Sequence, residues 1–368
     1  MLLSLLLSPH DGFQKLFYRC GEFFDAGHYT TIATAGYTSE GAGAFYPLWP
    51  MILKILTFGS TDRLIIGVVG SLVSSALFLI VLSALVQWAQ DQKLDMYRSL
   101  VFYLLILSPL SLFRVLNFTE SLFSICLVLM VFELNRKTPS LIRIAFFSAL
   151  LASVRPMLPF IIISGLLIAA MNYFRSRHEP VHSLRSDSAR AVSMSLGAII
   201  GYLPFGFYSQ NRFQNFWHPF DVQKLWDRKF GLYWDLIFSP KVINGSNEVL
   251  VWDLVAFYLP IILFVWGIYF FVFKKRDISD GLFRAFCFCV LIGCAHAGSA
   301  FLTFGRFMST GRHVLSNPLQ FMALLIAVQY VGLAYQSIVT KVLKFVVFVS
   351  FIFLGMWWFR YANDMWIG

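Results

Sequence analysis

The chain has 368 residues, of which 58% are hydrophobic and 18% aromatic, while only 13% are charged. This charged share, about half that of an ordinary globular domain, excludes a disordered chain, a secreted disulfide scaffold and a nucleic-acid-binding protein. The net charge of +10 is typical of a membrane protein instead, because basic residues collect in cytoplasmic loops.

Apolar runs follow one another along the chain, which we treat as a single membrane domain, 1–368. Because a bilayer core needs about 20 apolar residues per helix, this pattern predicts an all-α polytopic membrane protein with about 10–11 transmembrane helices. The predicted spans are 64–88, 97–113, 119–134, 141–154, 157–174, 191–208, 250–273, 285–304, 314–336 and 345–360. Residues 1–7 are too short to cross, and we expect the tail of a truncated first span or a tilted interfacial helix there.

Charge predicts the orientation of these spans. If residues 8–63 face outward, the inward segments are 89–96, 135–140, 175–190, 274–284 and 337–344. With their flanks they carry 15 of the 29 basic residues: Lys93, Arg98, Arg136, Lys137, Arg143, Arg175, Arg177, Arg185, Arg190, Lys274, Lys275, Arg276, Arg284, Lys341 and Lys344. The positive-inside rule therefore places the two long segments, 8–63 and 209–249, and the short segment 305–313 on the non-cytoplasmic side.

The first long segment, 8–63, contains a small polar cluster of Asp25, His28, Tyr29 and Tyr37 before a turn rich in proline and aromatic residues. An acidic residue at a membrane surface is costly unless it is functional or paired. On a helix Asp25 and His28 share one face, so Asp25 could act as a general base oriented by His28. The alternative from the same spacing is that Asp25 caps a helix over 26–35 and His28 lies on its surface.

Several segments in order resemble the PIG-V family, which contains the second mannosyltransferase of GPI-anchor synthesis and bacterial relatives. They are FDAGHYTTIATAGY (24–37), AFYPLWPMILKI (44–55), SPLSLFRVLNFTESLF (108–123), SALLASVRPM (148–157), NFWHPFDVQKLWDRKFG (215–231) and GRHVLSNP (311–318). The chain departs from the family pattern at Phe24, where Trp is usual before the Asp, at Asn117 and Phe118, and at His313, where Tyr is usual.

The resemblance implies a GT-C-like glycosyltransferase that transfers mannose from a polyprenyl- or dolichyl-phosphate donor to a glycan or glycolipid acceptor on the non-cytoplasmic face. Inversion at the sugar carbon requires one carboxylate to accept the proton of the acceptor hydroxyl, and Asp25 is the candidate. Arg155, Arg306 and Arg312 are candidates to clamp the donor phosphate, with His313 beside them, because a guanidinium matches phosphate oxygens in a fork. Each arginine also has an alternative role. Arg155 could mark the boundary of a span, and Arg306 and Arg312 could lie in a solvated loop.

Two further segments carry candidate binding residues. Glu120 in NFTESLF contributes either to the site or to a capping box with Asn117 as N-cap. The second long segment, 209–249, is rich in aromatic residues, and Gln223 and Trp226 are its candidates for covering the lipid donor or a sugar face. Its alternative is an aromatic belt at the membrane surface.

No cofactor is predicted. The sequence contains no DxD triad, P-loop, GxGxxG or Cys-x-x-Cys motif, so we expect no metal site and no nucleotide cofactor. The alternative function is a membrane transporter or lipid flippase, which favours charged residues within spans and internal repeats. We expect a multi-pass protein of a bacterial cytoplasmic membrane, or of the endoplasmic reticulum membrane if the source is eukaryotic.

Overall fold

A computed structural model describes residues 21–22, 24–175, 180–226, 228–238, 247–274, 278–303, 310–331 and 335–362 of the chain, and this part contains helices and no strand. The longer helices are α3 (Asp25–Ala35), α4 (Leu48–Leu56), α5 (Arg63–Asp91), α6 (Arg98–Leu107), α8 (Glu120–Asn135), α9 (Leu141–Val154), α10 (Leu158–Arg175), α11 (Pro180–Phe213), α14 (Asn247–Gly267), α15 (Asp280–Thr303), α17 (Leu319–Gln329) and α18 (Gln336–Ala362). Short helical turns join them: η2 (Glu40–Ala44), η3 (Pro109–Ser111), α7 (Leu112–Val115), α12 (His218–Asp221), η4 (Val222–Trp226), α13 (Asp235–Phe238), the π-helical η5 (Ile268–Phe273) and α16 (Thr310–Leu315).

The structure confirms a polytopic membrane protein but differs in the number of spans. Within the described residues, six helices are long and apolar enough to cross a membrane: α5, α10, α11, α14 with η5, α15 and α18. The predicted span 97–113 is α6 followed by η3 and α7, a pair bent by 62° that could form a seventh. The predicted span 314–336 is likewise divided between α16, α17 and the start of α18.

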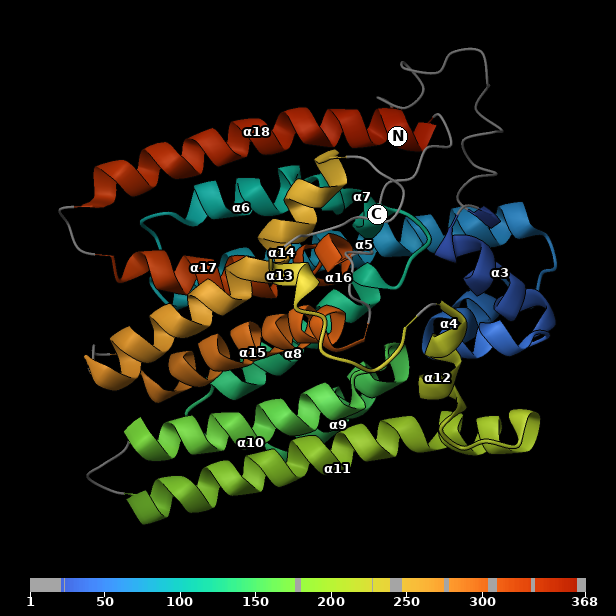
Figure 1. The fold of residues 1–368 in the computed structure, drawn as a ribbon, viewed down its shortest axis with the longest axis horizontal. Helices are drawn as coiled ribbons and strands as arrows, with labels where there is room; N and C mark the ends of the chain where they lie inside the picture. Colours follow the sequence, from blue (N-terminus) through green and yellow to red (C-terminus); the bar gives the residue numbers. More distant parts are fainter. Residues whose placement is uncertain are drawn as a thin grey trace.

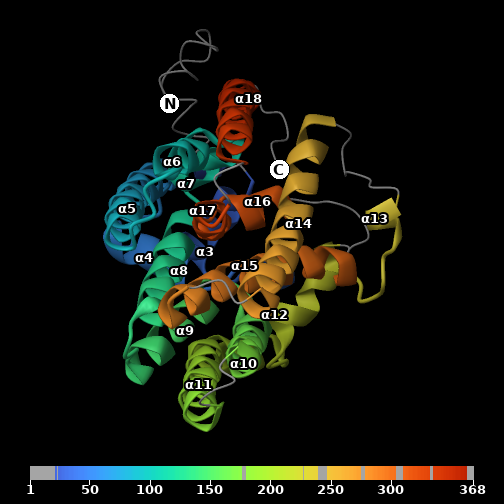
Figure 2. The ribbon, with the colours of Figure 1, turned by 90° about the vertical axis from the view of Figure 1, so that its left-hand side faces the viewer.

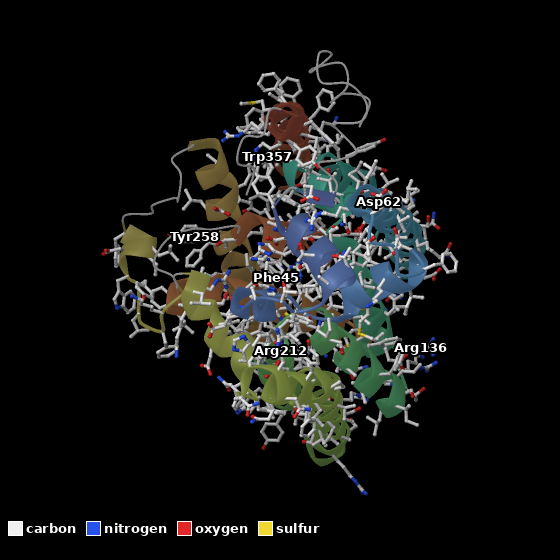
Figure 3. The ribbon with its side chains drawn as sticks, turned by 90° about the vertical axis from the view of Figure 1, so that its right-hand side faces the viewer. Phe45, Asp62, Arg136, Arg212, Tyr258 and Trp357 are labelled. Atoms are coloured by element: carbon white, nitrogen blue, oxygen red, sulfur yellow. The ribbon has the colours of Figure 1, made fainter. Side chains whose placement is uncertain are left out.

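The long segment predicted over 8–63 is not irregular. From residue 25 onward it contains α3, η2 and α4, and the second long segment contains the end of α11, α12, η4, α13 and the start of α14. Of these, α3, α4 and α12 lie at one end of the molecule, on the right in Figure 1, whereas α13 lies nearer the middle of the view. Figure 3 views this end, with Phe45 near the middle of the face.

The helix ends that border the basic segments lie together at the other end of the bundle, on the left in Figure 1. They are the ends of α5, α8, α10 and η5 and the starts of α6, α9, α11, α15 and α18. We call this the basic end and the other the opposite end. The grouping agrees with the predicted topology, because each predicted inward segment connects helix ends on the same side.

Three helices form the interior of the bundle. Viewed along its length, α8, α15 and α17 lie between α5, α11, α14 and α18 (Figure 2). Residues 281–293 of α15 are buried without interruption, as expected for a helix surrounded by others, and Arg284 within this stretch donates to the carbonyls of Leu134 and Arg136. The outer helix α18 instead exposes Phe345, Phe348 and Phe351, as expected for a face that contacts lipid.

Helices α9 and α11 pack closely through small residues. A side chain at Gly197 would collide with the backbone of Ala145, and one at Gly201 with the backbone of Ala149. Small residues four positions apart on both helices let the backbones meet, the arrangement that favours helix association in a membrane. The hydroxyl of Ser153 adds a bond to the Gly201 carbonyl (2.9 Å). This contact fixes the C-terminal end of α9, immediately before Arg155.

Candidate functional site

Asp25 is the first residue of α3, at the opposite end of the bundle. The N-cap of this helix is Phe24, which has a positive φ of 52° and makes no side-chain capping bond. Positive φ is rare for a non-glycine residue and persists only where the surroundings hold it. The interpretation of Asp25 as a helix cap is therefore wrong, and its side chain, one third exposed, is available to the cavity described below.

A chain of ion pairs connects Asp25 to two arginines. Atom Nη1 of Arg312 lies 2.7 Å from Oδ2 of Asp25. Its Nε atom donates to Oε1 of Glu120 at 2.5 Å, and the same oxygen lies 2.7 Å from Nη2 of Arg155. Arg155 and Arg312, which lie far apart in the sequence, thus both contact the same carboxylate oxygen of Glu120.

Glu120 is completely buried, and its second oxygen, Oε2, has no hydrogen-bond partner in the part of the chain that the structure describes. A buried carboxylate is tolerated where it is paired with cations, and here one oxygen serves two. Glu120 does not line the cavity. It therefore supports the site without contacting the cavity, by holding the guanidinium groups of Arg155 and Arg312 side by side.

Aromatic rings and a threonine complete the support of these arginines. The guanidinium of Arg312 lies over Phe118 and Phe113, 4.5 and 4.8 Å from the ring centroids, and that of Arg155 lies 4.9 Å from the centroid of Phe123. Such stacking is favoured for a planar, weakly hydrated cation.

Thr119 links Arg155 to α3. Its Oγ1 accepts from Nε and Nη2 of Arg155 at 3.1 and 3.0 Å and lies 3.4 Å from the hydroxyl of Tyr29. Thr119 also occupies the N-cap position of α8, without a side-chain capping bond. The capping box predicted for Asn117 and Glu120 is therefore wrong.

Asn117 instead ties three segments together beneath the site. Its Oδ1 accepts from Trp49 Nε1 at 3.1 Å, and its Nδ2 donates to Thr30 Oγ1 at 3.3 Å. The side chain is fully buried, so Asn117 has a structural role beneath the cavity.

The short helix α16 carries Arg312 and His313 and is held at both ends by buried charged side chains. At its start, the amide of Gly311 donates to Oδ1 of Asp253 on α14, at 2.5 Å. At its end, Arg114 donates to the carbonyls of Leu315, at 2.7 Å, and Ser316. An acid at the start of a helix and a cation at its end satisfy its unpaired backbone groups and complement its dipole.

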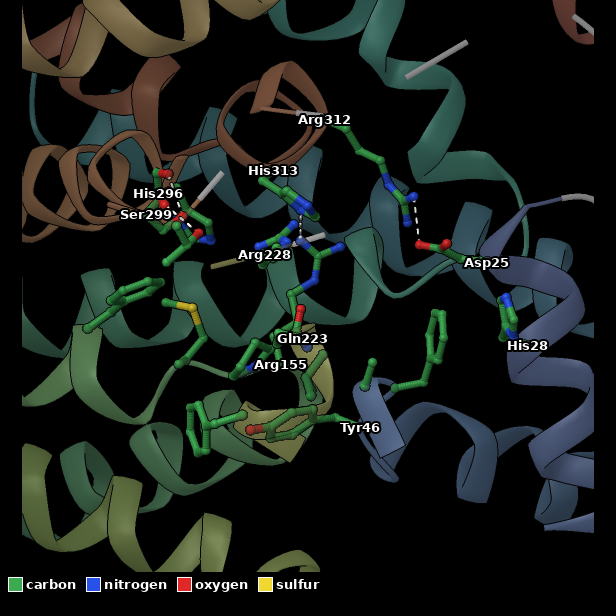
Figure 4. A pocket seen from close by; sticks show the side chains of 18 of the residues that line it. Asp25, His28, Tyr46, Arg155, Gln223, Arg228, His296, Ser299, Arg312 and His313 are labelled. Carbon is green, nitrogen blue, oxygen red and sulfur yellow. Dashed lines mark hydrogen bonds and ion pairs between the residues drawn. The ribbon is translucent and has the colours of Figure 1, made fainter. Parts of the chain in front are cut away.

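These elements surround a cavity of about 540 Å³. Figure 4 shows Asp25 and His28 on one side, Arg155, Arg228 and His313 in the middle, and His296 and Ser299 on the other side. Among the described residues, the lining includes one carboxylate, that of Asp25, and four cations: Arg155, Lys224, Arg228 and Arg312. The interior therefore favours an anion.

Two histidines in the lining have assignable tautomers. Nδ1 of His313 lies 3.3 Å from Nη1 of Arg155, and since a guanidinium only donates, Nδ1 accepts and the proton is on Nε2. Nδ1 of His296 lies 2.8 Å from the Ile292 carbonyl, which only accepts, so here Nδ1 carries the proton. Burial, followed by the charges of Arg155, Arg312 and Arg228, holds the pKa of His313 well below its ordinary value. His313 therefore serves as a neutral donor.

The cavity brings together seven of the residues predicted from the sequence: Asp25, His28, Tyr29, Arg155, Gln223, Arg312 and His313. The ring of His28 stacks on Phe45 at 4.4 Å, whereas the carboxylate of Asp25 is paired with Arg312, which orients it. Burial lowers the pKa of His28, and the negative charge of Asp25 partly offsets this effect.

Two predicted residues with described side chains, Glu120 and Tyr37, do not line the cavity. The hydroxyl of Tyr37 is buried away from it and donates to the Phe45 carbonyl at 2.8 Å, which fixes the turn before α4. Arg306 and the side chain of Trp226 lie outside the described residues.

Six further residues were not predicted from the sequence: Lys224, Arg228, His296 and Ser299 in the lining, and Asp253 and Arg114 behind it. The spacing of His296, Ser299 and Thr303 was a usable signal, because residues three and four apart share one face of a helix. The chain matches no family model, no curated protein and no solved structure.

Proposed function

We propose that this protein is a glycosyltransferase of the GT-C type that uses a polyprenyl- or dolichyl-phosphate sugar and acts on the non-cytoplasmic side of the membrane. One observation carries the proposal: a partly exposed carboxylate, Asp25, lies in a cation-rich cavity at the end of the bundle opposite to the basic end. Mannose as the sugar, and a glycan or glycolipid as the acceptor, follow from the resemblance to the PIG-V family.

The charges of the cavity suit a lipid-phosphate donor. The donor is a phosphodiester with one negative charge, and its phosphate gains a second as the sugar leaves. Arg155 and Arg228 lie where this charge can be stabilised, and the Nε2–H group of His313 can donate to it. Interactions that strengthen as charge develops lower the barrier rather than merely tighten binding.

The reaction needs one base. The acceptor oxygen attacks the anomeric carbon, the bond from that carbon to the phosphate oxygen breaks, and the electron pair leaves with the phosphate. The proton of the acceptor hydroxyl passes to Asp25. One oxygen of this carboxylate, Oδ2, is paired with Arg312, which leaves Oδ1 for the proton.

The direct test is transfer of radiolabelled sugar from defined polyprenyl-phosphate donors by the purified full chain, with the product identified by mass spectrometry. We expect transfer from polyprenyl-phosphate mannose with inversion at the sugar carbon, and its loss in Asp25→Asn. Absence of transfer from a panel of lipid-phosphate sugars to membrane glycolipid extracts would refute the proposal. So would transfer that Asp25→Asn leaves intact.

A further inference from the structure

Residues 228–238, which we call the strap, run along the outer end of α15. Three strap amides donate to the last three carbonyls of that helix: Lys229 to Thr303 (2.7 Å), Gly231 to Leu302 (2.8 Å) and Tyr233 to Phe301 (3.2 Å). The last carbonyls of a helix have no partner within the helix, so the strap satisfies them. Its position is therefore fixed by these backbone contacts, together with the side chain of Leu236, which is buried against α14 and α15.

The strap carries a row of exposed apolar side chains. The exposed fractions are 87% for Phe230, 63% for Leu232, 56% for Trp234 and 80% for Phe238. In an extended segment alternate residues share a face, which groups 230, 232 and 234. A cluster of exposed large apolar side chains marks a surface that contacts another molecule or lipid.

The start of the strap belongs to the cavity. Both Arg228 and Phe230 line it. Burial lowers the pKa of Arg228 and the charge of Asp25 opposes this effect, which places the guanidinium within electrostatic reach of the candidate base. Phe230 lines the cavity and is also largely exposed, so it lies at an opening. Within three residues the chain therefore passes from a cation inside the cavity to an apolar side chain at its opening.

We infer that the strap binds the lipid carrier of the donor, with Arg228 on its phosphate and the row from Phe230 to Phe238 on its isoprenoid chain; this inference rests on the proposed function. A lipid phosphate is an anion followed by a long apolar chain, and the strap presents a cation followed by apolar groups in the same order. A general aromatic contact with the bilayer explains exposed rings, but it requires neither Arg228 nor Phe230 in the cavity.

The test measures binding of polyprenyl phosphates of increasing chain length, without sugar, to the full chain in nanodiscs. The wild type is expected to bind longer carriers more tightly. In Phe230→Ser/Leu232→Ser the longest carrier is expected to bind about tenfold more weakly and the shortest as before, because only the contact with the chain is lost. Arg228→Gln is expected to weaken all lengths by a similar factor.

The matched control is Phe345→Ser/Phe348→Ser on α18, whose side chains are similarly exposed to lipid but lie on another element. It is expected to bind all carriers as the wild type does. The inference is overturned if Phe230→Ser/Leu232→Ser keeps the wild-type dependence on chain length, or weakens all lengths equally. It is also overturned if that variant lowers only the unfolding temperature in nanodiscs, since the strap would then be a bilayer anchor.

This experiment separates the inference from the proposed function. Binding is measured without sugar or acceptor. If the protein shows no transfer activity but its binding still depends on carrier length through the strap residues, only the proposed glycosyl transfer is refuted. An active enzyme that is insensitive to the strap substitutions refutes only the role of the strap. A photoreactive group at the end of the isoprenoid chain adds a direct readout, because it is expected to label strap peptides in the wild type and not peptides of α18.

Discussion

Nη1 of Arg312 lies 2.7 Å from Oδ2 of Asp25, and this ion pair joins α16 near the end of the chain to α3 near its start. The same arginine donates to the buried Glu120. The candidate base is therefore oriented by a cation that is itself held by a second acid. A substitution at any of the three positions alters the environment of the other two, so each variant needs a partner that separates chemistry from structure.

Asp25→Asn is expected to lower the turnover number by about 10²–10⁴ while the protein stays folded. The amide keeps the size of the carboxylate and can still accept from Arg312, but it cannot take up a proton. The measurement is the kcat of sugar transfer, with the unfolding temperature recorded in parallel. Asp25→Glu, which retains a displaced carboxylate, is expected to keep part of the activity; equal activity of the Asn variant and the wild type would exclude Asp25 as the base.

Arg312→Ala is expected to destabilise the protein by about 3–5 kcal/mol, because it leaves Glu120 buried with only Arg155 as a partner. The sequence suggested a phosphate clamp at Arg312, but in the structure two carboxylates already engage its guanidinium. Arg312→Lys keeps the positive charge but lacks the planar guanidinium that contacts two carboxylates at once. It is expected to lose less stability than Arg312→Ala. Denaturant unfolding in mixed micelles measures both. An Arg312→Ala protein as stable as the wild type would show that the ion pairs contribute nothing.

The neutral state of His313 predicts a loss of stability in acid. In the unfolded chain His313 titrates near its ordinary pKa of about 6.5, whereas in the folded protein its pKa is held well below that value. Below about pH 6.5 only the unfolded state takes up the proton, so stability falls as pH falls, by at most about 1.4 kcal/mol per pH unit. Above that pH the group is neutral in both states and contributes no slope.

His313→Gln is expected to flatten this dependence when the unfolding temperature is followed from about pH 7 to about pH 5. The slope will not vanish, because the pKa of His28 is lowered as well, by burial against the charge of Asp25. His28→Gln serves as the second arm. Identical slopes in the wild type and His313→Gln would show that the pKa of His313 is not lowered in the folded protein.

The spans could be predicted from the sequence where a helix has to cross the bilayer by itself, as α5 and α15 do. The predicted spans 97–113 and 314–336 are each interrupted near a proline. Pro109 disfavours a helical conformation in Ser108, where α6 ends, and α16 ends at Leu315, shortly before Pro318. The span 314–336 is interrupted a second time after Gln329, where the sequence has no proline. Helix α9, with 14 residues, is shorter than a bilayer core requires.

Within the site, local patterns identified the residues that line the cavity from α3 and from the Arg-Pro and Gly-Arg-His segments. They could not identify the role of Glu120, because two arginines from other parts of the chain decide it. Asp253 and Arg114 gave no signal for a related reason. Each bonds to backbone groups of α16 far along the sequence, and a backbone partner leaves no mark on residue identity.

Asp253 supplies the last prediction. Its Oδ1 accepts from the Gly311 amide at the start of α16, and a leucine of similar size would leave this buried amide without a partner. Such a group costs about 1–3 kcal/mol, and the helix is expected to shift and displace Arg312 and His313. Asp253→Leu should therefore lower both the unfolding temperature and kcat, whereas Asp253→Asn, which retains an acceptor oxygen, should restore most of both.

The two Asp253 variants distinguish positioning from mere stabilisation. If Asp253 positions α16, kcat in Asp253→Leu stays low at temperatures where the variant is fully folded, and the pH dependence attributed to His313 changes with it. If Asp253 only stabilises the bundle, the folded fraction of Asp253→Leu transfers sugar at the wild-type rate. The second outcome would show that the bond from Asp253 to α16 does not contribute to catalysis. The proposed catalytic groups would then be Asp25 and the cations of the cavity alone.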